Sequence, residues 1–253
     1  VSLTWLAGHT KNIEFGPLVS PVSFRDPTMT ARMASAVDDL SHGRLVLGLG
    51  AGWQEREHDK FGWDLLDVPE RFARFEEGLE VIARLLTSDD PVDFTGAYYE
   101  LNEAILLPRP QRPGGPPILI GGNGPKRTLP LVAQYADEWN AVYISHDDYH
   151  ERNQRLDALL AENGRQPEDV RRSLMTRVEI GDQQALEETF ANSQLSLDEI
   201  KARGLVLGTP GEIVDQLGQW AETGVQRIML QWLDLDDLDG IEKLARDVLP
   251  QVH

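Results

Sequence analysis

The stretch Arg44-Leu-Val-Leu-Gly-Leu-Gly-Ala-Gly-Trp53 decides the fold. Arg44–Leu49 predicts a strand, and a polar segment that favours a helix follows Trp53. The glycines between them let the backbone turn tightly, or approach a planar ring or a phosphate closely. They do not form a dinucleotide-binding fingerprint, because the spacing is GxGxG and no acidic residue ends a following strand about 20 residues later. A structural turn and a binding loop both stay open at this point.

The same alternation of strand and helix runs along the whole chain. Strands are expected near 13–19, 44–49, 118–121, 138–144, 174–180 and 227–232. Helices are expected at 27–40, 69–86, 126–136, 146–163, 184–203, 209–223 and 237–249. This order predicts parallel βαβ units, arranged either as an open doubly wound sheet or as a closed (β/α)8 barrel of the TIM type.

A closed barrel would need two more strands than these. Eight strands usually take about 250 residues or more, and two absent βαβ steps correspond to about 60 residues. The chain begins without Met, and Val1–Ala7 has the pattern of the inside of an amphipathic helix. We therefore expect one domain over residues 1–253, an N-terminally incomplete barrel. A proline-rich excursion with a small hairpin is expected at about 90–117.

Composition excludes several classes of function. The 253 residues include 24 Lys and Arg against 42 Asp and Glu, a formal charge of −18 that disfavours nucleic acid and anionic membrane surfaces. The absence of Cys excludes disulfides, thiolate metal sites and thiol catalysis. The six His form no close metal-ligand pattern, so no metal is expected. Without a membrane-length apolar run or a signal peptide, a cytoplasmic location is the default expectation.

Two further loops have the composition of binding sites. Gly121-Gly-Asn-Gly124 ends a strand and opens a helix beside Lys126 and Arg127, an arrangement that suits an anion, although a plain glycine-rich turn would have the same sequence. Phe15–Pro21 contains one Gly and two Pro and makes a poor regular strand. A bulge is expected there, and such irregular backbone gathers at functional sites.

Acid–base candidates are few. Glu55, Glu57, His58 and Asp59 follow the glycine-rich loop, and they suit either proton transfer or the solvated first turn of a helix. Trp139 and Asn140 lie on an expected strand and either reach its binding end or belong to the core. No residue is assigned as catalytic.

Taken together, several segments resemble the luciferase-like monooxygenase superfamily, most closely its coenzyme F420-dependent branch. The resemblance covers nearly the whole chain in order, and it depends on the sequence and spacing of modest motifs. They are Ser20-Pro-Val-Ser-Phe-Arg-Asp-Pro27, Leu40-Ser-His-Gly43 with the stretch up to Trp53, Glu57-His58, Arg71-Phe72, Tyr98-Tyr99, Pro117-Ile-Leu-Ile-Gly-Gly122, Tyr135-Ala-Asp-Glu-Trp-Asn140 and Gly208-Thr-Pro210.

The resemblance implies a (β/α)8 barrel that binds a flavin-type ring at the carboxyl ends of its strands. It implies a bulge near 15–21, with a non-prolyl cis peptide at Leu18–Val19 that supports the ring. It further implies that the loop Gly50, Ala51, Gly52 and Trp53 lines the cofactor, and that Gly121, Gly122, Asn123 and Gly124 hold its phosphate. Asn140 completes the set of expected cofactor-binding residues. Two departures are the lack of counterparts to the family's first two strands, which supply acid–base residues, and Pro17, where a small polar residue is common.

The implied function is hydride transfer between coenzyme F420 and a small organic substrate. An FMN-dependent monooxygenase of the same fold is the alternative, and a non-catalytic flavin-binding or structural relative is an alternative of another class. A homodimer is expected from the family, with the helix Met29–Leu40 and the segment Leu3–Ala7 as candidate interface surfaces.

Overall fold

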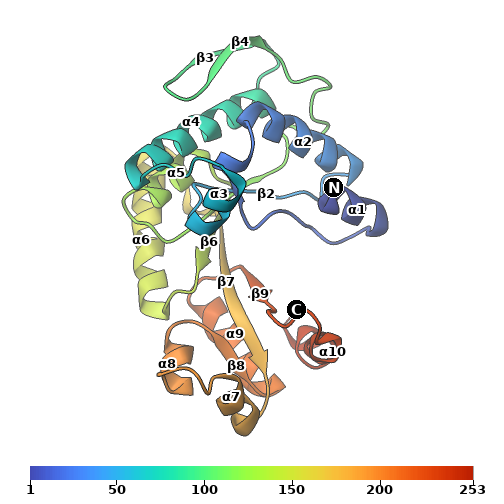
Figure 1. Ribbon diagram of the computed structural model, residues 1–253, viewed down its shortest axis with the longest axis vertical. Helices are drawn as coiled ribbons and strands as arrows, with labels where there is room; N and C mark the ends of the chain where they lie inside the picture. The colour runs from blue at the N-terminus through green and yellow to red at the C-terminus, as the bar shows by residue number, and fades with distance from the viewer. Residues whose placement is uncertain (253) are drawn as a thin grey trace. The chain divides into compact units, whose positions relative to one another are not determined.

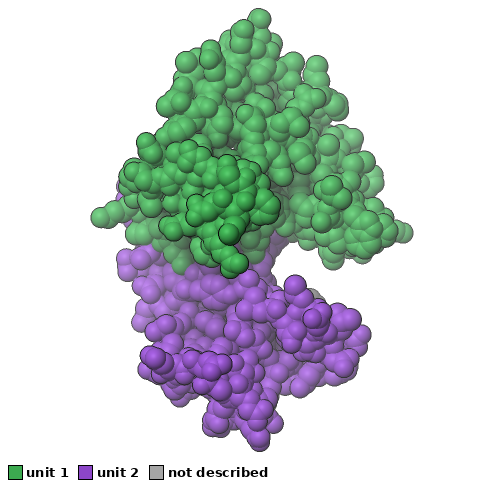
Figure 2. All heavy atoms as spheres, viewed as in Figure 1, with its two compact units in different colours: residues 1–138 green, residues 139–253 purple. Residues whose placement is uncertain are grey.

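A computed structural model describes residues 1–252, and the remaining residue, His253, lies outside the described part. The chain divides into two compact units, Val1–Glu138 and Trp139–His253 (Figure 2). Each unit is built around parallel strands joined by helices, as the alternation in the sequence predicts. The expectation of a single domain over 1–253 stays a prediction.

The first unit places three parallel strands side by side. β1 (Ser20–Pro21) pairs with β2 (Leu47–Gly50), and β2 pairs with β5 (Ile118–Gly121). A separate antiparallel hairpin confirms the expected one in the excursion and extends beyond α4 (Figure 1). The other elements of this unit are α1 (Ser2–His9), η1 (Val22–Phe24), α2 (Pro27–Leu40), α3 (Glu55–Phe61), α4 (Val68–Thr87), β3 (Val92–Thr95), β4 (Glu100–Ala104) and α5 (Thr128–Tyr135).

The second unit is organised by one long strand, β7 (Arg171–Ile180). Its first half pairs with β9 (Arg227–Gln231) and its last residues pair with β8 (Val206–Gly208), both in parallel. Its other elements are α6 (His146–Glu162), η2 (Pro167–Asp169), α7 (Gln183–Thr189), α8 (Leu197–Ala202), α9 (Pro210–Glu222), α10 (Leu238–Asp247) and η3 (Leu249–Gln251), and β6 (Glu138–Val142) begins at the last residue of the first unit.

Helix boundaries follow from capping residues in the sequence. The Asp26 side chain accepts a hydrogen bond from the Thr28 amide, and Pro27 takes the first helical position of α2. In α4, Phe75, Leu79 and Ile82 fall on one face and are almost fully buried, as their helical spacing predicts. Burial of such side chains contributes about 2 kcal/mol each, so this face of α4 is a principal part of the core.

Three expectations from the sequence need correction. Residues 13–19 do not form a regular strand: Phe15 alone forms a bridge, to Leu45 just before β2, and β1 starts at Ser20, because Gly16 and Pro17 interrupt the ladder. The predicted helix 184–203 is two helices, α7 and α8, with Ser196 capping the second. The strand β8 was not predicted, because three residues are too few to show a period.

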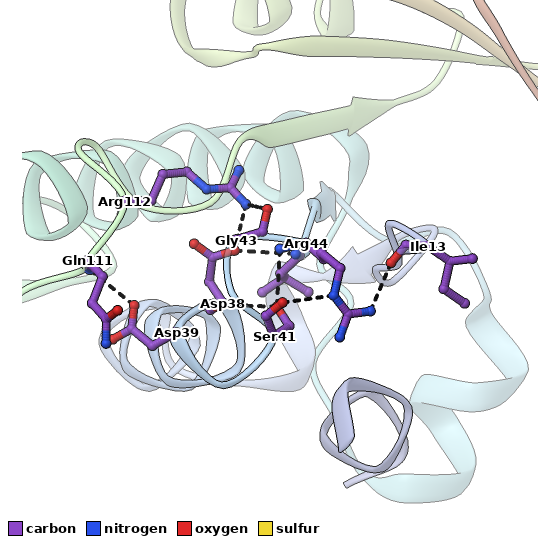
Figure 3. A network of polar contacts seen from close by, with 9 residues as sticks. Ile13, Asp38, Asp39, Ser41, Gly43, Arg44, Gln111 and Arg112 are labelled. Atoms are coloured by element: carbon purple, nitrogen blue, oxygen red, sulfur yellow. Dashed lines mark hydrogen bonds and ion pairs between the residues drawn. The ribbon is translucent and has the colours of Figure 1, made fainter. Parts of the chain in front are cut away.

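A polar network closes the end of the first unit where β2 begins (Figure 3). All five donor positions of Arg44 are used: Nε donates to the Ser41 carbonyl, and the two terminal nitrogens donate to groups of Ala7, Thr10 and Ile13. Arg112, from the proline-rich excursion, pairs with the buried Asp38 at 2.8 Å. The network therefore fastens the chain before β1 and the excursion to the turn before β2.

Candidate functional site

The carboxyl ends of β1, β2 and β5 lie at one edge of the parallel sheet. Ser20 is in register with Leu49, and Leu49 is in register with Ile120. The segments Gly50–Trp53 and Gly121–Gly124 lie at this edge, at the ends of β2 and β5, whereas Leu18–Val19 immediately precedes β1 and lies beside Gly48 and Gly50 of β2. All three were expected from the family resemblance to contact a cofactor, and the two loops lie at the edge where ligands of parallel α/β proteins bind.

The Leu18–Val19 segment lies against three glycines of the neighbouring strands. The peptide between the two residues is cis, at the position that the family resemblance implies. A Cβ at Gly48 would overlap the carbonyl oxygen of Pro17, and Cβ atoms at Gly50 and Gly121 would lie 2.7 and 3.2 Å from methyl groups of Val19. Gly48 is therefore required by the approach of the protein's own backbone, and a side chain at Gly50 or Gly121 would have to displace Val19.

The Gly50–Trp53 loop combines a fixed backbone with an exposed side chain. Gly50 and Ala51 are buried, and Gly52 has a φ of +91°, which favours glycine. Arg71 of α4 donates 3.0 and 3.2 Å hydrogen bonds to the carbonyls of Gly52 and Leu66. Trp53 is 77% exposed, an unusual position for an indole. The loop thus presents a broad aromatic surface at the edge of the sheet.

The four acid–base candidates separate into two kinds. Glu55, Glu57 and Asp59 are exposed on α3, so they form the solvated face of a helix. His58 is 1% exposed, with Nδ1 2.7 Å from the Gln54 carbonyl oxygen and Nε2 2.7 Å from Ser23 Oγ. The structure therefore places one candidate, His58, in a fixed environment under the Gly50–Trp53 loop.

The Gly121–Gly124 loop leads from β5 towards α5. Gly122 has a φ of +125°, and the Gly124 carbonyl accepts the first hydrogen bonds of α5, from the amides of Thr128 and Leu129. The loop is half-exposed, and Lys126 and Arg127 beside it are exposed. The positive end of the α5 dipole and two cations meet here, which favours a negatively charged group.

Asn140 and Trp139 lie in the second unit, where Trp139 packs in the core and Asn140 has an acceptor without a partner. Trp139 is fully buried and stacks on Tyr149 with ring centroids 5.3 Å apart, so it belongs to the core. Asn140 is 1% exposed, and its amide nitrogen donates to Ser173 Oγ at 3.0 Å, whereas its Oδ1 has no hydrogen-bond partner. A buried acceptor without a partner is costly unless a ligand or water supplies the donor.

Sequence reasoning missed two residues of this site. Ser23 and Arg71 both fall within segments that resemble the family, but neither received a role. Their contacts link residues far apart in the chain, since Ser23 meets His58 and Arg71 meets Gly52. No spacing rule along one strand or helix relates such pairs.

Two further observations concern metals and membranes. Among residues 1–252, no group of three or more His, Cys, Asp or Glu side chains is placed to hold a metal ion. Within the same residues, no helix combines the length and apolar character needed to cross a membrane.

Comparison with known proteins gives consistent matches. The sequence model of the family described as luciferase-like monooxygenase matches residues 1–195. The F420-dependent glucose-6-phosphate dehydrogenase of Amycolatopsis mediterranei is 28% identical over 292 residues, which cover 100% of this chain and 84% of that protein. The phthiodiolone/phenolphthiodiolone dimycocerosates ketoreductase of Mycobacterium kansasii is 30% identical over 248 residues, 96% of this chain but only 60% of that protein.

Among solved structures, an F420-dependent secondary alcohol dehydrogenase, in complex with an F420-acetone adduct, superimposes with a TM-score of 0.84 at 20% identity. The match covers 100% of this chain and 84% of that one. At this identity the likeness establishes the fold. It confirms the predicted α/β class with a mostly parallel sheet, that of the luciferase-like TIM barrels.

Proposed function

Since the chain belongs to the luciferase-like monooxygenase family, we propose that it is a coenzyme F420-dependent oxidoreductase that moves a hydride to or from a small organic substrate. The dehydrogenase from Amycolatopsis and the solved alcohol dehydrogenase both use this coenzyme, which supports F420 as the cofactor. Their substrates differ, so the similarity supports the class of reaction and leaves the substrate of this chain unassigned.

The observation that carries the proposal is that Gly50–Trp53 and Gly121–Gly124 meet at the carboxyl edge of β2 and β5, with Val19 packed against both strands. Leu18 and Trp53 offer exposed apolar surface, 42% and 77% exposed, for one side of a planar ring. The Gly121–Gly124 loop, at the start of α5, would hold a phosphate. The cofactor, when bound, supplies the hydride chemistry, and the protein supplies binding and orientation.

The residues of the first unit fit such a group in two respects. The backbone of the Gly50–Trp53 loop is fixed by Arg71, so the loop does not have to order itself on binding. The Gly121–Gly124 loop is half-exposed, and the exposed Lys126 and Arg127 beside it suit a negatively charged group. Asn140, in the second unit, stays a predicted cofactor residue. No proton donor or acceptor for the substrate is assigned to this chain.

An FMN-dependent monooxygenase is the second candidate, because the family takes its description from such enzymes. A flavin and a deazaflavin present similar rings, so the edge described above suits either. A relative without catalytic activity is the candidate of another class. Small molecules are the proposed partners in each case.

A homodimer is also proposed. Met29, Met33 and Leu40 are 48%, 42% and 62% exposed on α2, and Trp5 of α1 is 60% exposed. Such exposed apolar side chains on packed helices are typical of protein interfaces. Sedimentation of the purified protein at several concentrations tests this, and a monomer at all of them would refute it.

A titration with both cofactors tests the function. We expect oxidised F420 to bind with a change in its absorbance or fluorescence, and FMN to bind at least about tenfold more weakly, a difference of about 1.4 kcal/mol. Tight FMN binding without F420 binding would favour the monooxygenase. Binding of neither would refute an oxidoreductase function of this chain.

A further inference from the structure

His58 connects the loops that follow two neighbouring strands. It lies on α3, below the loop after β2, and its ring contacts Ser23 in the loop after β1. We propose that His58 is a positioning residue, which with Ser23 fixes the backbone of the Gly50–Gln54 loop in the conformation that binds the cofactor. The proposal deepens the proposed function and rests on it.

In its neutral form the ring of His58 satisfies both contacts in one tautomer only. The Gln54 carbonyl oxygen can only accept, so Nδ1, 2.7 Å away, carries a proton. In the neutral imidazole, Nε2 is then an acceptor, and the Ser23 hydroxyl donates to it at 2.7 Å. Both ring nitrogens therefore have partners, and each partner belongs to a different loop.

The surroundings of the His58 ring leave few alternatives to these two hydrogen bonds. Phe24 and Trp63 lie 5.4 and 6.3 Å from the ring of His58, centroid to centroid, and the histidine is 1% exposed. Water has little access to replace a lost partner. A nitrogen that loses its partner here stays unpaired, and burial of an unpaired polar group is unfavourable. The loop positions that satisfy both nitrogens are therefore few.

The loop between the two anchors depends on them for its shape. His58 holds the Gln54 carbonyl and Arg71 holds the Gly52 carbonyl, on either side of Trp53. The indole is 77% exposed and contributes little packing of its own. Gln54 precedes α3 and provides no side-chain cap, and its carbonyl accepts from the backbone amide of His58 as well as from the ring.

Three substitutions separate the two bonds of the ring. Ser23→Ala removes the donor to Nε2, His58→Asn retains a donor near Nδ1 and removes the acceptor, and Ser23→Thr keeps the hydroxyl as the conservative variant. His150→Asn, an exposed histidine on α6, is the matched control. The measurements are hydrogen exchange of the cofactor-free protein, the F420 dissociation constant and the melting temperature.

For Ser23→Ala and His58→Asn we expect exchange in the peptide over residues 51–55 to accelerate by about tenfold, the effect of losing one buried hydrogen bond. The F420 dissociation constant should rise by a similar factor of about ten, because the loop must then be ordered on binding. The exchange of residues 118–121 should change little, and the melting temperature should fall by no more than the loss of one buried hydrogen bond explains. Ser23→Thr and His150→Asn should behave as the wild type.

Unchanged exchange at 51–55 in both variants would overturn the proposal, whatever the affinity for F420. A fall in melting temperature with faster exchange throughout the first unit and an unchanged dissociation constant would also overturn it, since it would show a general structural role. If the wild type binds neither F420 nor FMN, the proposed function fails, and with it the cofactor role of His58. In that case the hydrogen-exchange result alone tests whether His58 and Ser23 fix the backbone of the Gly50–Gln54 loop.

Discussion

The two ends of β2 lie among different kinds of residues. At its start, Asp38, Ser41 and Arg44 join Arg112 in a network of charged and backbone groups (Figure 3). At its other end, the chain continues through glycines to an exposed Trp53. The first end fastens distant segments together, whereas the second end leaves surface uncovered. In parallel barrels the amino ends of strands serve stability and the carboxyl ends serve binding, and this strand follows the same division.

The largest expected effect lies between the two ends, at Gly48. Gly48→Val should prevent folding of the first unit, because the new side chain would overlap the Pro17 carbonyl, which is backbone and cannot move aside. Gly218→Ala in α9 is the matched control, since nothing lies within 4 Å of its Cβ and alanine favours a helix by roughly 0.5–1 kcal/mol. Circular dichroism and soluble yield measure both. A folded Gly48→Val protein would contradict the packing described here.

Removal of Arg44 tests the amino end of β2. Arg44→Met should lower the free energy of unfolding by about 2–4 kcal/mol, because several charge-assisted hydrogen bonds to backbone carbonyls are lost together. Urea denaturation measures this loss. The F420 dissociation constant of the folded protein should stay unchanged. A large change in F420 affinity would show that the amino end of β2 also contributes to cofactor binding, against the division described above.

Gly50→Ala tests the carboxyl end in the same terms. The added Cβ would lie 2.7 Å from a methyl group of Val19, and a side-chain shift should cost about 1–2 kcal/mol of stability. The free energy of F420 binding should become less favourable by more than this loss of stability, because Leu18–Val19 would move. The double variant with Val19→Ala should recover the stability. Lack of recovery would mean that the strain does not pass through Val19.

The pH dependence of stability should report Asp38. Burial raises the pKa of this carboxyl above its ordinary value of 3.8, although the Arg112 charge lowers it. A raised folded pKa gives stability that is complete below the unfolded pKa and is lost as pH rises through the folded pKa. Relative to Asp38→Asn, the wild type should therefore become less stable as pH rises above 3.8. Denaturation curves at several pH values measure this dependence, and Arg112→Met should enlarge it. A wild type that gains stability relative to Asp38→Asn as pH rises would refute the raised pKa of Asp38.

Trp53→Ala should give the smallest change in stability. An indole that is 77% exposed buries little area, so the free energy of unfolding should change by less than about 0.5 kcal/mol. The F420 dissociation constant should nevertheless rise about tenfold, since the apolar face for the ring is lost. Phe61→Ala, which removes an exposed aromatic side chain of α3, is the control that should alter neither quantity much. Equal affinities of wild type and Trp53→Ala would remove Trp53 from the site.

Local signals in the sequence predicted most elements of the fold. The Asp26-Pro27 start of α2 and the apolar stripe of α4 fix their helices through nearby residues alone. The position of the cis peptide at Leu18–Val19 followed from family resemblance and is present in the structure. β8 escaped prediction because its three residues show no period.

The candidate site was only partly predictable. The three loops were recognised because each ends a predicted strand, but the reason for their glycines was not. Gly48 and Gly50 meet Pro17 and Val19, residues about 30 positions earlier, so their role depends on how the strands pack. The partnership of Ser23 and His58 likewise arises only when the loops after β1 and β2 meet.

The central claim is that the cofactor binds at the carboxyl ends of β1, β2 and β5. Hydrogen exchange of the wild type with and without F420 tests it most directly. We predict protection by F420 in peptides over 18–24, 50–55 and 121–128, with no change over 38–45 and 109–113. Protection over 38–45, or none at the three carboxyl-end segments although F420 is bound, would contradict the claim.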